Sequence, residues 1–243
     1  MTGKWIPLAA LLILSACSTT RVLPDGKYRL ESNKIHISDA KGVKSSDISP
    51  YIKQSPNSSF IFGWNPLLNV YNWSDGSGSK ISRFWEKIGT APVVFNHDLI
   101  PESRENILTR LEYMGFYNSE VHTSIDTVKR RVRVNYFVSP GKQYPIEEIT
   151  YKLPVGNAVF RNEFDADRRN IGTKPGDNLS EMSLELESSR SAGYFNNLGY
   201  YDFNKGNYFF EVDTLGGKAL LNYEIRDYNR NESPLNAKPI EKY

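Results

Sequence analysis

The sequence has few of the residues that build disulfides, metal sites and redox centres. Cys17 is its only cysteine, and its 3 histidines, His36, His97 and His122, are isolated from one another. One cysteine excludes an intramolecular disulfide. No H-x-x-x-H pair, and no cysteine next to a histidine, supplies ligands at metal-binding spacing. We therefore expect neither a metal ion nor another cofactor.

An excess of charge of one sign is also lacking. The chain carries 30 Lys and Arg against 28 Asp and Glu, which gives a formal net charge of +2. Its longest basic run is Lys129, Arg130 and Arg131. Because nucleic-acid binding depends on a concentrated basic surface, we expect no nucleic-acid partner.

Catalytic signatures are missing as well. The sequence has no G-x-S-x-G elbow, and Gly76-x-Gly78 lacks the preceding strand and the third glycine of a dinucleotide-binding turn. Glu147 with Glu148, and Asp165 with Asp167, are acidic pairs of a type used in general acid–base catalysis. We interpret them as solvated charges, and we predict that the protein is not an enzyme.

The N-terminus contains an apolar run from Ile6 to Leu14. The run is too short to span a bilayer as a helix, which needs roughly 20 residues, and it is typical of an export signal. Leu14-Ser15-Ala16-Cys17 resembles the bacterial lipobox, whose cysteine is lipidated after cleavage just before it. We predict a signal peptide at residues 1–16 and a Cys17 that carries acyl chains such as palmitate, enough for stable membrane attachment.

Alternating apolar residues predict a β-hairpin over residues 120–138. Val132, Val134, Tyr136 and Val138 fall on one face of its second arm. Before it, residues 101–114 carry apolar side chains at helical spacing. Gly115 follows, as expected for a glycine that ends a helix in the left-handed conformation.

The same order returns later in the chain. Asn178 and Glu181 are a candidate N-cap and N3 pair for a helix that ends at Gly199, with Gly193 as a point where it kinks or splits. A hairpin joined through Gly216-Gly217 follows. Gly115-Phe116-Tyr117 and Gly199-Tyr200-Tyr201 lie 84 residues apart. This spacing indicates a duplicated domain, in which each glycine ends a helix and the aromatics begin the next strand.

Short strands at residues 34–38 and 146–151 open the two units. We predict a linker at 17–29, a first domain at 30–142 and a second at 143–227. Residues 228–243 are predicted to be a further linker or the start of a truncated further domain. The first domain is the longer because it contains a Gly/Ser-rich loop, residues 74–79, and an aromatic segment. Each unit is predicted to pack a small three-stranded sheet on two helices, an α+β fold.

This β-α-α-β-β pattern, with its repeated glycine-aromatic phrase, resembles the POTRA domain of the BamA/TamA outer-membrane assembly family. Gln54-Ser55-Pro56-Asn57, Asn69-Val70-Tyr71-Asn72 and residues 89–94 are similar to the N-terminal region of TamA-like lipoproteins, which are tethered through a lipobox cysteine. The resemblance covers residues 14–226. Members of that family continue into a membrane β-barrel, and we expect this sequence to stop short of it, as a truncated product or a fragment.

The resemblance implies the periplasm-facing arm of an outer-membrane assembly or translocation factor. Ser18-Thr19-Thr20, which contains no Asp, resembles outer-membrane retention. The implied partners are unfolded outer-membrane polypeptides, a periplasm-spanning or inner-membrane protein, and the membrane itself through the lipid anchor.

Client binding is predicted to use strand addition, because the open edge of a sheet presents backbone groups that bind an extended segment of any sequence. The predicted edges lie at Ile35 and Ile37, at Ile149 and Tyr151, and at Tyr208 and Phe210. An alternative is a lipid-anchored surface protein that binds glycan through Trp64, Trp73 and Trp85. The same tryptophans can equally pack in the first domain's core.

Overall fold

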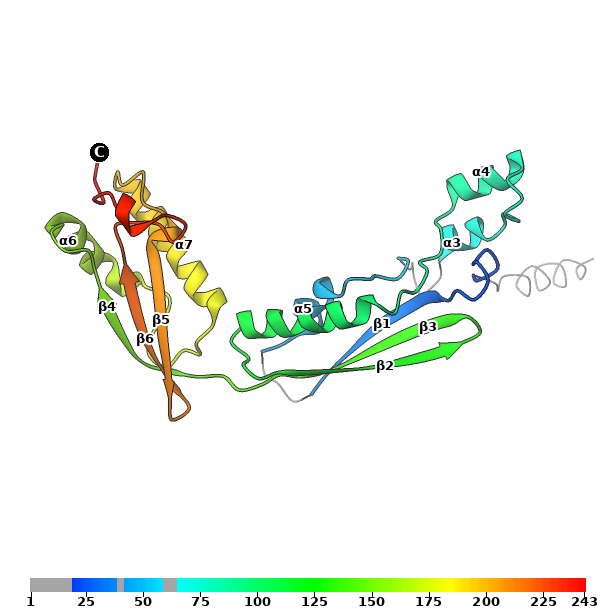
Figure 1. Cartoon of the computed structure of the whole chain (residues 1–243), viewed down its shortest axis with the longest axis horizontal. Helices are drawn as coiled ribbons and strands as arrows, with labels where there is room; N and C mark the ends of the chain where they lie inside the picture. The colour runs from blue at the N-terminus through cyan, green and yellow to red at the C-terminus, as the bar shows by residue number, and fades with distance from the viewer. Residues whose placement is uncertain (1–18, 39–41, 59–64) are drawn as a thin grey trace, which may run out of the picture. The chain divides into compact units, whose positions relative to one another are not determined.

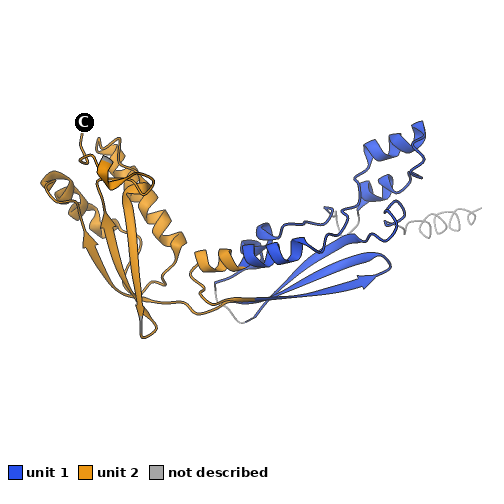
Figure 2. Ribbon diagram, in the orientation of Figure 1, with its two compact units in different colours: residues 1–107, 121–139 blue, residues 108–120, 140–243 orange. Residues whose placement is uncertain are grey.

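The computed structural model describes residues 19–38, 42–58 and 65–243 (Figure 1). The predicted signal peptide, Cys17 and Trp64 lie outside the described residues. The chain divides into two compact units (Figure 2). Unit 1 contains residues up to 107 together with 121–139, and unit 2 contains residues 108–120 and 140–243.

Unit 1 is built on a three-stranded sheet with the strand order β1-β3-β2. The strands are β1 (Arg29–Ile37), β2 (Glu120–Val128) and β3 (Arg131–Ser139), and β1 runs parallel to β3. The helices between β1 and β2 are α2 (Ser45–Ile48), the 3-10 turn η1 (Ser49–Tyr51), α3 (Pro66–Tyr71), α4 (Lys80–Ile88) and α5 (Leu99–Tyr113).

The core of unit 1 follows the alternation of β3. The side chains on one face of this strand, Val132, Val134, Tyr136 and Val138, are buried as predicted, together with Leu30 of β1 and Ile107 of α5. On the opposite face Asn135 is also buried. Its amide donates hydrogen bonds to Ser124 and Asp126 of β2, which replace the hydrogen bonds to water that burial removes.

Unit 2 repeats this arrangement with a second three-stranded sheet, in the order β4-β6-β5. β4 (Ile146–Lys152) is parallel to β6 (Lys218–Ile225), and β5 (Tyr208–Leu215) is antiparallel to β6. The helices are α6 (Ala158–Asp167) and α7 (Glu181–Asn197), with 3-10 turns η3 (Arg168–Asn170), η4 (Lys205–Asn207) and η5 (Pro234–Asn236). The predicted α+β fold of tandem β-α-α-β-β units is confirmed.

An aromatic cluster fills the core of unit 2. Phe160 stacks on Phe195 with ring centroids 4.4 Å apart, and Tyr200 meets Phe160 edge-to-face at 5.4 Å. Tyr208 and Tyr223, from β5 and β6, are fully buried beside them. Aromatic rings in such contacts contribute beyond the area that they bury.

The repeated phrase forms the same helix ending twice. Gly115 has a φ of +89° and Gly199 a φ of +102°. Phe116 N–H donates to the Leu111 carbonyl, as Tyr200 N–H donates to the Phe195 carbonyl. Both endings are therefore Schellman motifs that need a residue in the left-handed conformation, and the prediction that these glycines end helices is confirmed.

Three local predictions need correction. Ser180, not Asn178, caps α7, because its side chain accepts the Ser183 N–H, whereas residue 178 forms an isolated β-bridge with Pro145. α7 runs through Gly193 without interruption. The aromatics of the repeated phrase lie in connecting loops and do not begin a strand, since β2 starts at residue 120 and β5 at residue 208.

Candidate functional site

The free edge of β5 carries backbone groups that no strand of the described chain pairs with. Arg226 N–H donates to the Asn207 carbonyl, so these two residues form a hydrogen-bonded pair in the ladder. Because pairing alternates in an antiparallel ladder, the N–H and C=O groups of Phe210, Val212 and Thr214 point to the open edge. The N–H of Tyr208 instead donates to the Lys205 carbonyl, so the open part of the edge begins at Phe210.

A groove of about 1080 Å³ adjoins this edge within unit 2. Phe210, Val212 and Thr214 line it from β5. Leu179 and Leu184, both buried, line it from the start of α7, and the remaining lining includes Tyr113, Tyr117 and Tyr144. The residues whose backbone faces the edge thus also face a trough in which apolar and aromatic side chains are mixed with charged ones, among them Glu112, Glu181 and Glu211. An extended segment laid there would find main-chain partners and apolar contacts together.

Charged groups form the rim of this groove. Glu185 accepts hydrogen bonds from Lys205 Nζ and the Tyr113 hydroxyl, both at 2.8 Å. The hydrogen bond from Lys205 lowers the pKa of Glu185, and the bond to Glu185 raises the pKa of Tyr113. Arg226 lies over the Phe209 ring, 4.2 Å from its centroid, and pairs with Glu224. The rim therefore stays ionised at neutral pH.

The other predicted edges, in β1 and β4, are partly covered. Leu30 N–H donates to the Val93 carbonyl, which pairs the first residues of β1 with the segment before α5. Ile146 N–H likewise donates to the Asp177 carbonyl, which covers the start of β4. Ile35 and Ile37 of β1, and Ile149 and Tyr151 of β4, lie beyond these covered stretches in edge strands.

Sequence reasoning missed the residues that complete the trough along the β5 edge. Leu179, Leu184 and Tyr144 come from three segments, and only the tertiary fold brings them together. The repeated glycine-aromatic phrase is the sequence signal that marks one of them, because its first copy contacts Tyr144. Tyr117 of the first repeated phrase meets Tyr144 edge-to-face at 5.5 Å, and Tyr201 of the second stacks on Tyr243 at 6.4 Å.

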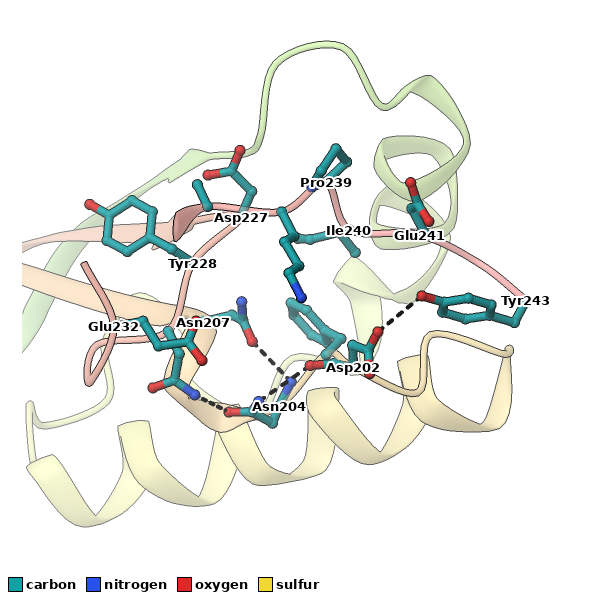
Figure 3. A pocket seen from close by; sticks show the side chains of 14 residues that line it. Asp202, Asn204, Asn207, Asp227, Tyr228, Glu232, Pro239, Ile240, Glu241 and Tyr243 are labelled. Carbon is teal, nitrogen blue, oxygen red and sulfur yellow. Dashed lines mark hydrogen bonds between the residues drawn. The ribbon is translucent and has the colours of Figure 1, made fainter. Parts of the chain in front are cut away.

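A second hollow of about 850 Å³ lies between residues 227–243 and the segment that joins α7 to β5, at residues 202–207 (Figure 3). Its polar lining is bonded internally: Tyr243 donates to Asp202 at 3.0 Å, and Asn204 N–H donates to Asn207 at 3.0 Å (Figure 3). Ile240 is buried in the core of unit 2 beneath it. The hollow is therefore part of the packing of unit 2 and not a binding site. Residues 228–243, predicted to be a linker, are held on unit 2.

The acidic pair Asp165 and Asp167 was interpreted as solvated, and for Asp167 this is wrong. Its side chain is buried and accepts two hydrogen bonds from Arg190, at 3.2 and 2.7 Å. Arg190 also donates to Glu187, which is buried as well. Glu187 raises the pKa of Arg190 through these hydrogen bonds. This network ties α6 to α7 and has a structural role.

Among the described residues, no three His, Cys, Asp or Glu side chains gather in an arrangement that could hold a metal ion. No helix in the described part of the chain is both long enough and apolar enough to cross a membrane. Of the tryptophans proposed for glycan binding, Trp73 is exposed and meets the half-buried Trp85 edge-to-face at 5.1 Å.

Residues 31–141 match the family model described as POTRA, surface antigen variable number repeat. The matched residues, which take in most of unit 1 together with residues 108–120, are similar to a POTRA domain. The match ends where β3 gives way to unit 2. Unit 2 repeats the element order and the sheet topology of this domain with its own residues.

Solved structures of the same kind of domain resemble the chain. POTRA domains 1–2 of the periplasmic domain of Omp85 from Anabaena are 11% identical, with 83% of this chain and 98% of that chain covered and a TM-score of 0.34. POTRA domains 3–5 of BamA from Haemophilus influenzae are 12% identical, with 84% and 99% covered and a TM-score of 0.32.

BamA from Haemophilus ducreyi lacking POTRA domains 1–3 is 20% identical, with 56% of this chain covered and a TM-score of 0.35. The chain spans 24% of that protein. A comparison with curated proteins found no match.

Proposed function

We propose that the chain is the periplasm-facing arm of an outer-membrane protein assembly or translocation factor, similar to a TamA-like lipoprotein. Cys17 would anchor it to the outer membrane through its acyl chains. In this proposal, unfolded outer-membrane polypeptides bind as an added strand at the edge of β5. A periplasm-spanning or inner-membrane protein would be a further partner.

The observation that carries the proposal is the coincidence of the open β5 edge with the adjoining groove. The backbone groups of Phe210, Val212 and Thr214 face outward, and their side chains line the same trough. Main-chain bonds tolerate any client sequence, whereas the trough favours a segment with apolar residues at every second position. Segments that later form strands have this alternation.

The test is site-specific photo-crosslinking in the full chain. Val212 and Leu220 are matched positions, since each side chain is 38% exposed, but Val212 lies on the edge strand and Leu220 on the central strand β6. A photoreactive residue at position 212 should trap a urea-diluted, unfolded outer-membrane polypeptide, whereas one at position 220 should not. Equal trapping at both positions, or none at 212, would refute strand addition at this edge.

A proline variant separates backbone pairing from apolar contact. Val212→Pro removes an N–H that points away from β6, so the ladder within unit 2 keeps its hydrogen bonds, as prolines in edge strands do. Val212→Thr keeps the N–H and is the control. We expect the proline variant alone to lose the crosslink from position 214, with an unchanged far-UV circular dichroism spectrum. Crosslinking that persists in the proline variant would show that main-chain pairing is not used.

A further inference from the structure

In the α3–α4 hairpin of unit 1, the buried side of α4 is polar. Ser74 and Ser82 are fully buried, their hydroxyl oxygens lie 2.6 Å apart, and both donate to Glu86. Asn72, also buried, donates to the Leu68 carbonyl. A buried polar seam is stable here because its groups satisfy one another, and from α3 the apolar side chain of Leu68 is buried as well.

The apolar side chains of α4, apart from the half-buried Trp85, instead face outward. Ile81 is 72% exposed, Phe84 54% and Ile88 47%, and these three residues of α4 share one helical face. Trp73 at 60% and Leu67 at 52% are exposed beside the same helix pair. Single exposed apolar residues are normal in proteins, whereas a contiguous apolar patch marks a surface that contacts something.

The geometry of the hairpin makes this outward face rigid. Thr90 N–H donates to the Leu67 carbonyl at 3.0 Å, and a Cβ on Gly89 would lie 2.3 Å from the backbone nitrogen of Tyr71. Ser79 caps α4 by accepting the Ser82 N–H. The two helices therefore hold each other closely, and rotation of α4 to bury its apolar face would break the polar seam.

Basic residues border the apolar face. Lys80, Arg83 and Lys87 recur at the same spacing as the exposed apolar residues, each one position before an apolar residue of this face, and all three are exposed. No ion pair engages them within the described residues. Asp75, whose pKa hydrogen bonds from Ser77 lower to about 2, is an exposed acid in the preceding loop. An outward apolar stripe edged by Lys and Arg is the pattern of a helix that lies in the surface of an anionic bilayer.

The N-terminal segment reaches the same hairpin. Val22 N–H approaches the Asn72 side-chain oxygen at 3.4 Å, and Leu23 is buried. Only four residues separate Val22 from Cys17. Because this connection is short, a lipid on Cys17 would hold the α3–α4 hairpin close to the bilayer surface.

We propose that the outward face of α4, with Trp73, lies in the surface of an anionic phospholipid bilayer and orients unit 1 against it. This inference rests on the proposed membrane attachment, but not on client binding at β5. Insertion would place Phe84 roughly 5–10 Å below the headgroup level. Acyl chains would supply attachment, and α4 would supply orientation.

The test uses the full, lipidated chain in vesicles of phosphatidylethanolamine and phosphatidylglycerol. Lipidation consumes the only native thiol, so Phe84→Cys can be labelled selectively with an environment-sensitive fluorophore. Val155→Cys in unit 2, at a position 96% exposed, is the matched apolar control. We expect the label at 84 to shift to shorter wavelength and to be quenched by lipids that carry a shallow nitroxide, while the label at 155 does neither.

A second variant guards against misfolding at position 84. In a chain labelled at Ile88→Cys, the additional substitution Ile81→Glu should reduce quenching of the label by the nitroxide lipids. The chain should still float with the vesicles through its anchor. A floating chain whose label at 84 behaves like the label at 155 would overturn the proposal, and would leave the face to a glycan, a protein or a second copy. A chain that does not float would refute the anchor instead, and loss of crosslinking at position 212 would refute client binding.

Discussion

Gly115 approaches the backbone of Leu179 so closely that a Cβ atom on the glycine would lie 2.2 Å from the Leu179 carbonyl oxygen. Leu179 immediately precedes the capped start of α7, and its N–H donates to the Tyr144 carbonyl. The second copy repeats the relationship: a Cβ on Gly199 would lie 2.8 Å from the Tyr243 carbonyl oxygen. Each glycine thus ends a helix, and its lack of a side chain leaves room for another backbone segment.

Gly115→Ala should destabilise unit 2 more than its backbone conformation alone explains. A left-handed conformation costs an L-residue about 1–2 kcal/mol, and the clash with the Leu179 carbonyl adds to this. Gly156→Ala is the control, because Gly156 has a φ of +97° and a Cβ added to it would meet no atom within 4 Å. Urea unfolding followed by circular dichroism should show the larger loss for Gly115→Ala. Equal losses would show that the close approach relaxes freely.

Arg190→Met should destabilise unit 2 strongly. Arg190 makes the paired hydrogen bonds to Asp167 and Glu187, whose side chains are only 3% and 1% exposed, and its removal leaves two buried carboxylates together. Breaking a buried pair in this way typically costs about 3–5 kcal/mol. The control is Lys218→Met, whose partner Glu147 is 50% exposed, with an expected change of about 0–1 kcal/mol. Similar unfolding midpoints for both variants would contradict a structural role for the network.

Two buried tyrosines should respond oppositely to loss of the hydroxyl. Tyr208 donates to Ser191 at 2.7 Å, so Tyr208→Phe should cost about 1 kcal/mol. The Tyr223 hydroxyl makes no hydrogen bond of acceptable geometry within the described residues. Tyr223→Phe should therefore be neutral or stabilising by about 1 kcal/mol. Thermal unfolding of the two variants, which differ from wild type by one oxygen each, checks the difference in sign.

The same tyrosines predict an alkaline limit to stability. Burial raises the pKa of Tyr208 and of Tyr223 above the ordinary value of 10.0. A raised folded-state pKa means that the stability is fully present below pH 10 and is lost as the pH rises, because the unfolded chain releases these protons first. Unfolding free energies measured from pH 8 upward should fall above about pH 10, and less steeply in Tyr223→Phe. A parallel fall in wild type and variant would argue against burial as the cause.

The sequence predicted those features that depend on local spacing. The alternation of Val132, Val134 and Tyr136 determines the buried face of β3, and Gly115 and Gly199 end their helices, because both signals act within a few residues. The start of α7 was misplaced, since Asn178 and Ser180 are both good caps and the tertiary bridge between residues 145 and 178 decides between them.

The candidate site was predictable only in part. Strand alternation located β5, but the trough along its edge needs Tyr144, Leu179 and Leu184, which meet only through long-range packing. Burial of Asp167 was hidden for a similar reason, because its partner Arg190 lies on another helix. In α4 the helical periodicity is plain, but the sequence does not show that its polar face is the buried one.

Lys129 and Arg130 join β2 to β3 with both residues in the left-handed region, at φ values of +48° and +62°, and they should respond oppositely to substitution. A two-residue turn of this type favours Asn-Gly, so Lys129→Asn should stabilise the hairpin. Arg130→Gly relieves more strain but removes hydrogen bonds to the carbonyls of Leu23, Pro24 and Lys27. Trypsin should therefore cut after Lys27 faster in Arg130→Gly than in wild type or Lys129→Asn. Arg130→Lys, which keeps the charge without the planar fork, should resemble the glycine variant; protection equal to wild type would show that charge alone holds this segment.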